Sequence, residues 1–163
     1  MTLDFKTTVW SDNSGNAYTS DEVIAMIKSQ IVNYQKIHIG SDSHRARKSK
    51  HVAVATAICC WSEEIRQGGW YCFVRKNYPR KTFSTLYERL FHEAQASVDI
   101  ACFLRDEVGL SVESVHVNVN TVEDEASSKY ATSIKGFVEA FGFECKLKPD
   151  DWAAGGVADK HAR

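Results

Sequence analysis

The sequence predicts an α/β domain with a mixed sheet of five strands, helices on the faces of that sheet and an additional N-terminal helix. Three apolar segments follow one another at residues 36–42, 51–61 and 69–78, and their short connections favour an antiparallel meander. Helix and strand patterns then alternate to the C-terminus, as they do in βαβ units. Right-handed crossovers should place a strand at residues 114–120 beside the first strand and parallel to it.

The N-terminal part of the chain divides into two segments of different character. Residues 1–18 are polar and show no apolar periodicity, so we expect them to be irregular. Residues 19–34 are expected to form a helix, because Thr19 or Ser20 can cap its free backbone N–H groups. Apolar residues recur at helical spacing from Val23 onward, which gives this helix one apolar face.

Strict alternation assigns the two faces of the first predicted strand. Ile37 and Ile39 share one face, and Asp42 lies on the opposite face at the strand end. A dense basic loop leads to the second strand, which is long and rich in β-branched residues. Gly68 and Gly69 are typical of the turn that precedes the third strand.

The second half of the chain alternates between helical and strand patterns. A long amphipathic helix is predicted at residues 84–107, and Gly109 is placed to end it. The later elements are a strand at 114–120, a helix at 124–142, a strand at 143–148 and a helical tail interrupted by Gly155 and Gly156. This order completes the five strands of the predicted sheet.

Length and composition are those of a folded domain. The chain has 163 residues, 44% hydrophobic and 25% charged, and we expect one domain at residues 19–163 after the irregular residues 1–18. No apolar run approaches the ~18 residues of a membrane span, and the N-terminus lacks the pattern of a secretory signal. We therefore expect a cytoplasmic protein with no membrane contact. The five cysteines form no C-x-x-C pair, which favours buried, reduced thiols.

The net charge of −1 gives the chain no overall basic field, so any contact with nucleic acid has to come from a local patch. The first such patch is the loop after Asp42, with Arg45, Arg47, Lys48 and Lys50 as candidate phosphate contacts. The same loop, taken alone, is equally typical of a solvated hairpin tip. A second basic run contains Arg75, Lys76, Arg80 and Lys81.

Three carboxylates on separate elements can meet at one end of the predicted sheet. Asp42 ends the first strand, and Asn118 lies on the strand expected beside it. In the long helix, Glu93 falls at the edge of the apolar stripe, whereas Glu88 falls on the solvent side. Asp159 lies in the C-terminal tail. Taken singly, Asp42 is also typical of a turn and Glu93 of a boundary ion pair, but together they form an oxygen ligand set of the kind that Mg²⁺ or Mn²⁺ prefers.

Several motifs connect the chain to a known family. They are "IGSDS" at 39–43, "PRKTFSTLYERLFHEAQAS" at 79–97, "VHVNVN" at 115–120, "KPDDWAAGGVADK" at 148–160 and the serine pair at 127–128. With the order of elements, these motifs resemble the YkuK-type family of small ribonuclease H-like proteins. The resemblance extends from about Thr19 to the C-terminus.

The resemblance implies hydrolysis of phosphodiester bonds with two divalent ions, Mg²⁺ or Mn²⁺. The positions that match catalytic metal ligands are Asp42, Glu93, Asn118 and Asp159, with Glu88 as the alternative on the helix. Similar proteins tend to have Asp where Asn118 stands, and the loss of one anion should weaken metal binding. Glu123 and Asp124 either replace that anion or cap the next helix.

Two functions remain open from the sequence. The first is a metal-dependent nuclease acting on RNA, DNA or a hybrid, and the second is a catalytically weak or inactive module that binds nucleic acid. A third, weaker hypothesis makes transition-metal ligands of His38, His44, His116 and His161. The aromatic side chains of Trp70, Tyr71 and Phe73 either stack on bases or belong to the core. The oligomeric state is left open.

Overall fold

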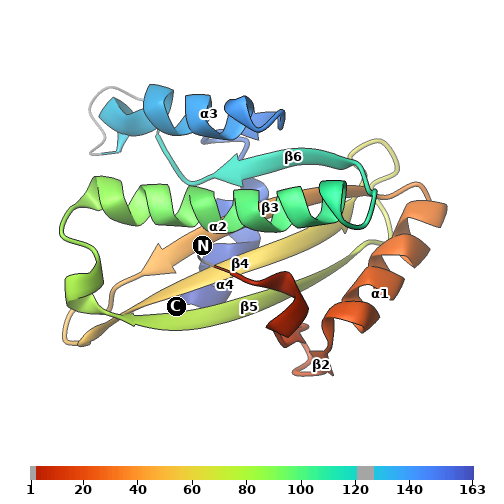
Figure 1. Ribbon diagram of the computed structural model, residues 1–163, viewed down its shortest axis with the longest axis horizontal. Helices are drawn as coiled ribbons and strands as arrows, with labels where there is room; N and C mark the ends of the chain where they lie inside the picture. The colour runs from red at the N-terminus through yellow and green to blue at the C-terminus, as the bar shows by residue number, and fades with distance from the viewer. Residues whose placement is uncertain (1–2, 121–126) are drawn as a thin grey trace.

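The computed structural model describes residues 3–120 and 127–163. A mixed sheet of seven strands lies at the centre of this part of the chain, in the order β2-β1-β5-β4-β3-β6-β7 (Figure 1). The strands are β1 (Trp10–Ser11), β2 (Ala17–Tyr18), β3 (Lys36–His44), β4 (His51–Trp61), β5 (Trp70–Pro79), β6 (Val112–Val117) and β7 (Cys145–Lys146). The helices are η1 (Phe5–Thr7), α1 (Ser20–Val32), η2 (Arg80–Thr82), α2 (Leu86–Asp106), η3 (Ser128–Tyr130), α3 (Ala131–Ala140), the π-helix η4 (Trp152–Ala158) and α4 (Asp159–Ala162).

Strand pairing confirms the predicted mixed sheet. Strands β3, β4 and β5 form the antiparallel meander, and β6 pairs with β3 in parallel, with Ile39 opposite Val115. Strand β7 then adds to β6, also in parallel. The C-terminal ends of β3 and β6 therefore lie next to each other, and this edge of the sheet holds the site described below.

The predicted count of five strands is wrong, because the segment expected to be irregular adds β1 and β2 to the edge of the sheet. Ser11 pairs with Phe73 of β5. Asp12 closes the turn between the two short strands by accepting hydrogen bonds from the backbone N–H groups of Ser14 and Asn16. Trp10 is fully buried in the main core, so apolar burial holds this hairpin on the sheet.

The helices form two unequal layers. Helices α1, α2 and α3 contribute Val23, Leu90 and Ile134, among other residues, to the main core on one face of the sheet. Helix α2 crosses that face, while α4 lies behind the sheet (Figure 1). Thr85 caps α2 by accepting from the backbone N–H of Glu88 at 3.1 Å. The start of the helix predicted at 124–142, with Glu123 and Asp124, lies outside the described residues.

The second layer is thin because small residues allow η4 and α4 to approach the sheet closely. Ala55, Ala57 and Ala153 pack together there. At Gly40 of β3, an added Cβ would lie 2.5 Å from both the carbonyl carbon of Ala153 and the backbone nitrogen of Ala154. Glycine inside a strand often marks such a close backbone approach. Gly40 thus fixes η4, and with it the start of α4, against the middle of β3.

None of the helices in the described residues combines the length and the apolar character that a membrane span needs.

Candidate functional site

Asp42, near the C-terminal end of β3, is the centre of the site and is only 4% exposed. Its Oδ1 accepts hydrogen bonds from Asn118 Nδ2 at 2.9 Å and from the backbone N–H of Ser43 at 2.8 Å. Asn118 directly follows β6, the parallel neighbour of β3. The contact between Asp42 and Asn118 is the one that the predicted strand order implies.

Glu93 reaches the same point from α2 and is 3% exposed. Ser43 Oγ donates to Glu93 Oε2 at 3.1 Å, which leaves the buried Oε1 without a hydrogen-bond partner. Burial raises the pKa of Glu93 well above its usual value, and the adjacent Asp42 charge raises it further. Glu88 lies elsewhere, because its carboxylate accepts from the backbone N–H of Ser84 at the start of the helix.

Asp159, the first residue of α4, approaches Asp42 from the other side of the sheet. Its Oδ2 accepts from Arg163 Nε at 3.1 Å. Burial raises the pKa of Asp42 to about 6, against the effect of the donors Asn118 and Ser43, and the facing Asp159 carboxylate raises it further. Asp42 is therefore the common member of two pairs of carboxyl groups, one with Glu93 and one with Asp159.

A polar cleft of about 700 Å³ opens beside these groups. Asp42, Asn118, Asp151 and Asp159 contribute oxygens to its lining, and Lys148 and Arg163 contribute positive charge. The cleft is thus lined by both acidic and basic side chains, an arrangement suited to a phosphate group next to a metal ion.

The donor chemistry of the site fits a hard divalent cation. Three buried oxygens in this region have no hydrogen-bond partner: Glu93 Oε1, Asn118 Oδ1 and Asp151 Oδ2. Oxygen ligands of this kind suit Mg²⁺ or Mn²⁺. Across residues 3–120 and 127–163, no three His, Cys, Asp or Glu side chains converge on one point as a ready metal cage. The arrangement is instead that of two carboxyl pairs sharing Asp42.

Two contributors to the site were not identified from the sequence. Ser43 bridges Asp42 and Glu93 through its backbone N–H and its hydroxyl group. Asp151, 5% exposed, precedes η4, and a Cβ at Gly155 would lie 2.8 Å from its Oδ2. The signal for Asp151 is present in the motif "KPDDWAAGG", where an acidic pair precedes two glycines.

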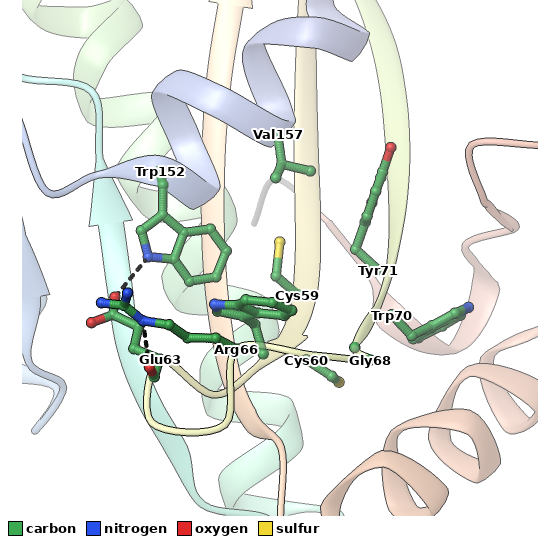
Figure 2. A pocket seen from close by; sticks show the side chains of 11 residues that line it. Cys59, Cys60, Glu63, Arg66, Gly68, Trp70, Tyr71, Trp152 and Val157 are labelled. Carbon is green, nitrogen blue, oxygen red and sulfur yellow. Dashed lines mark hydrogen bonds between the residues drawn. The ribbon is translucent and has the colours of Figure 1, made fainter.

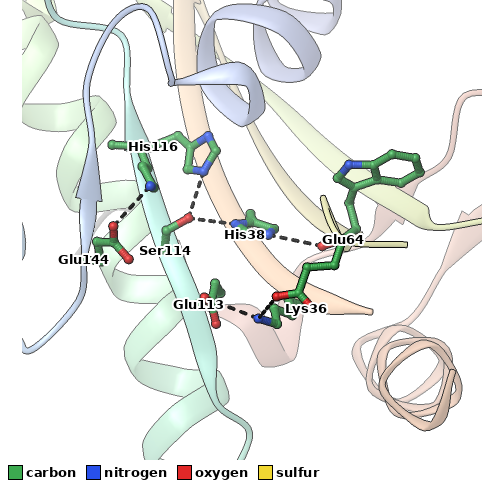
Figure 3. A network of polar contacts seen from close by, with 9 residues as sticks. Lys36, His38, Glu64, Glu113, Ser114, His116 and Glu144 are labelled. Carbon is green, nitrogen blue, oxygen red and sulfur yellow. Dashed lines mark hydrogen bonds and ion pairs between the residues drawn. The ribbon is translucent and has the colours of Figure 1, made fainter. Parts of the chain in front are cut away.

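The histidines near the sheet centre form a hydrogen-bonded chain (Figure 3). The backbone N–H of Ala153 donates to His116 Nδ1 at 3.0 Å, so the ring proton belongs on Nε2, which lies 2.8 Å from Ser114 Oγ. Ser114 Oγ lies 2.7 Å from His38 Nδ1, and His38 Nε2 lies 3.2 Å from the carbonyl oxygen of Trp61. Burial lowers the pKa of His116 to about 3 and also lowers that of His38. Every ring nitrogen of this pair is thus occupied, which leaves none for a metal.

The other two histidines also give no support to the transition-metal hypothesis. The ring of His161 stacks on Phe73 with centroids 3.6 Å apart, and its Nε2 lies 2.9 Å from the Tyr71 hydroxyl. His44 ends β3 and is not part of a metal-binding group among the described residues. Phe73 consequently serves packing, whereas Trp70 and Tyr71 line a separate cavity.

The predicted basic residues are all exposed on the loop between β3 and β4: Arg45, Arg47, Lys48 and Lys50. Within the described part of the chain they form no salt bridge. Arg45 also shares a cavity of about 220 Å³ with Arg80 and Arg89 at the start of α2. The loop therefore presents uncompensated positive charge immediately after the strand that carries Asp42.

A family model described as Ribonuclease H-like matches residues 19–163. This range includes all four residues predicted as metal ligands and excludes β1 and β2. No curated protein and no solved structure gives a significant match to the chain.

Proposed function

The chain belongs to the ribonuclease H-like family, and from this premise we propose that it is a nuclease that hydrolyses phosphodiester bonds with two Mg²⁺ or Mn²⁺ ions. The observation that carries the proposal is the position of Asp42, buried between the carboxyl groups of Glu93 and Asp159. The charges of Arg89 near Glu93 and of Arg163 on Asp159 offset only part of the unfavourable effect of placing these acidic side chains together, because the pKa values of Asp42 and Glu93 are still raised. A bound divalent cation removes that cost, so the site is suited to hold one.

The proposed metal ligands are Asp42, Glu93, Asn118 and Asp159. Bound Mg²⁺ or Mn²⁺ would supply an activated water and stabilise negative charge on the phosphate. The supporting residues orient these ligands before any ion arrives. Ser43 donates a hydrogen bond to Glu93 and so keeps its carboxylate near Asp42. Arg163, which follows Asp159 by one helical turn, donates to the Asp159 carboxylate and fixes its orientation.

Positive groups around the cleft support a nucleic-acid substrate. Lys148 and Arg163 line the cleft itself and can neutralise a phosphate placed against the carboxylates. Outside it, the cavity shared by Arg45, Arg80 and Arg89 provides three guanidinium groups, of which Arg89 also lies near enough to Glu93 to lower its pKa. Guanidinium groups recognise phosphates by paired hydrogen bonds. The RNA, DNA or hybrid backbone can therefore extend from the cleft toward α2.

A second candidate function is binding of nucleic acid without cleavage. The observation that favours it is the hydrogen bond from Asn118 Nδ2 to Asp42 Oδ1, which occupies a carboxylate oxygen that an ion would use. An amide at this position also lacks the charge of the Asp found in similar proteins. Under this alternative the basic loop and cleft hold the backbone, and the carboxyl groups are a catalytically weak remnant.

The test is a cleavage assay on labelled single-stranded RNA, single-stranded DNA, both duplexes and an RNA–DNA hybrid, each in Mg²⁺ and in Mn²⁺. Asp42→Asn is the matched variant, because Asn keeps the size of the side chain and the acceptor for Asn118. Asp150→Asn, an identical change at an exposed position, is the control. Metal-dependent cleavage that Asp42→Asn abolishes and Asp150→Asn retains would establish the nuclease. Binding without cleavage by all three proteins would establish the second function.

A further inference from the structure

A second cavity, of about 520 Å³, has Trp152 in its lining, as the cleft does. Its lining includes Trp61, Trp70, Tyr71, Trp152, Glu63 and Arg66. The chain has four tryptophans, and the one absent from this lining, Trp10, is fully buried in the core. Tryptophans that remain half-exposed and gather at one cavity are typical of a binding site for an apolar or aromatic ligand.

The aromatic walls are held in place by hydrogen bonds. Trp152, from η4, and Tyr71, from β5, stand on opposite sides of the cavity (Figure 2). Trp152 Nε1 donates to Glu63 Oε1 at 3.3 Å, and the Tyr71 hydroxyl lies 2.9 Å from His161 Nε2. A space between fixed rings loses little conformational entropy when a flat ligand enters it.

The loop between β4 and β5 is held in a costly backbone conformation at the mouth of this cavity. Arg66 has φ of 55°, in the left-handed region that side chains other than glycine rarely adopt. Its backbone N–H donates to the Ser62 carbonyl at 2.9 Å, and its Nε donates to the Glu63 carbonyl at 3.0 Å. Gly68 and Gly69 continue the loop with φ of 70° and 93°. These hydrogen bonds and the left-handed backbone together hold the Arg66 guanidinium at the cavity.

The charges at the cavity indicate what kind of ring fits. One carboxylate, Glu63, and one guanidinium, Arg66, flank the aromatic walls, so the lining carries no net charge from these two groups. A cationic ligand would meet the Arg66 charge, which argues against a cage for alkylammonium groups. Burial raises the pKa of Cys59 and of Cys60, the latter to about 12, so both thiols are neutral and poor metal ligands.

We propose that this cavity binds a nucleobase, stacked among the rings of Trp61, Tyr71 and Trp152, with Arg66 directed at the phosphate of the same nucleotide. The free oxygen of the Glu63 carboxylate supplies an acceptor for the N–H groups on the base edge. Such a base can come from a free mononucleotide or from an unpaired position in a nucleic-acid strand. The proposal does not require cleavage at Asp42, and it stands apart from the nuclease function.

Intrinsic fluorescence tests this directly, because Trp61, Trp70 and Trp152 report on the cavity while Trp10 is shielded. The protein is titrated in EDTA with adenosine, AMP, GMP, UMP and a short single-stranded RNA, and separately with tetramethylammonium. We expect saturable quenching by nucleotides. Trp61→Leu should weaken their binding roughly tenfold, the effect of losing one stacking surface. Because the titration is made in EDTA, nucleotide binding is measured without the divalent ions that the nuclease assay requires, which separates the two results.

Arg66→Gly is the sharper variant, because glycine adopts the left-handed conformation without strain and the loop is kept. This variant should bind AMP at least fivefold more weakly than the wild type and should bind adenosine with unchanged affinity. Tyr34→Gly is the matched control, since Tyr34 is also exposed and has φ of 65°. Quenching by mononucleotides identifies a free nucleotide as a source, and quenching by RNA alone identifies a strand base. No quenching by any of them, equal affinity in Trp61→Leu, or saturable binding of tetramethylammonium instead would overturn the proposal.

Discussion

Asn118 donates a hydrogen bond from Nδ2 to Oδ1 of Asp42 at 2.9 Å, across the ends of two parallel strands. This donor lowers the pKa of Asp42, against the larger effect of burial, which raises it. The amide oxygen of Asn118 is then left buried without a partner. Asn118 thus stabilises the charged form of Asp42 in the way that a cation would.

Replacing Asn118 with Asp should exchange stability for metal affinity. Without metal, a third carboxyl group beside Asp42 should lower the free energy of unfolding by about 2 kcal/mol through repulsion. With Mn²⁺, the restored anion should tighten binding and raise any cleavage rate. Thermal melts with and without Mn²⁺ measure both effects. Asn33→Asp, on the exposed end of α1, is the control, and equal Mn²⁺ responses in the two variants would remove Asn118 from the metal site.

Asp42→Asn should stabilise the metal-free protein at neutral pH. Burial raises the pKa of Asp42 to about 6 in the folded state, above the value of about 3.9 expected in the unfolded chain. The folded state therefore favours the neutral carboxyl, and its contribution to stability is present below pH 4 and lost as the pH rises through 6. The loss amounts to about 3 kcal/mol. Urea unfolding should give the variant a larger free energy of unfolding than the wild type at pH 8 and no such advantage at pH 4.

Gly40→Ala should displace η4 from β3. The new Cβ would lie 2.5 Å from backbone atoms of Ala153 and Ala154, and neither backbone can yield without moving the helix. Overpacking of this kind costs about 1–3 kcal/mol or more. Because Asp159 follows η4 directly, metal-dependent changes in stability should be lost as well. Gly136→Ala, where an added Cβ meets nothing within 4 Å, is the control and should leave both properties intact.

Strand order was the part of the fold that could be predicted best. Alternation in β3 and β6 and the right-handed crossover rule were sufficient to place Asp42 beside Asn118. Helical periodicity likewise separated Glu93, which is buried beside Asp42, from Glu88, which caps the helix. These predictions depend on local geometry that repeats along the chain, and tertiary packing did not override it.

Features that depend on single tertiary contacts could not be predicted. The strands β1 and β2 have two residues each, too few for a periodic signal, and they are held by burial of Trp10. The position of the Asp151 carboxylate in the cleft depends on the π-helix that follows it, and no periodic pattern in the sequence predicts such a helix. The aromatic cavity brings Trp61 and Trp152 together from opposite halves of the chain, which only the finished fold reveals.

The basic loop makes a separate prediction about salt. Arg47→Ala with Lys48→Ala should weaken nucleic-acid binding and reduce the slope of log affinity against log salt by about 2 for a duplex, because each phosphate contact releases one counterion. Fluorescence anisotropy across a salt series measures the slope. The double variant Lys28→Ala with Lys135→Ala removes the same charge from exposed helix positions. If the two pairs shift the slope equally, the loop acts only through net charge.

The chain of hydrogen bonds through His116 should make the fold sensitive to acid. Burial lowers the pKa of His116 to about 3, below the value of about 6.5 for an unfolded histidine. The neutral ring therefore contributes stability in full above pH 6.5, and the contribution is lost as the pH falls toward 3, by about 5 kcal/mol in total. His116→Asn keeps an acceptor for the backbone N–H of Ala153 but cannot titrate, and at pH 7 it should cost about 1–3 kcal/mol for the lost contact with Ser114.

The two proteins should therefore converge as the pH falls, and urea unfolding at pH 7.5, 6 and 4.5 measures the difference between them. His51→Asn removes a histidine that is exposed at the start of β4, so it should follow the wild-type curve at every pH. A difference between wild type and His116→Asn that stays constant from pH 7.5 to 4.5 would mean that the buried ring does not resist protonation. In that case the ring would carry a proton on both nitrogens in acid, and His116 Nδ1 could no longer accept from the backbone N–H of Ala153.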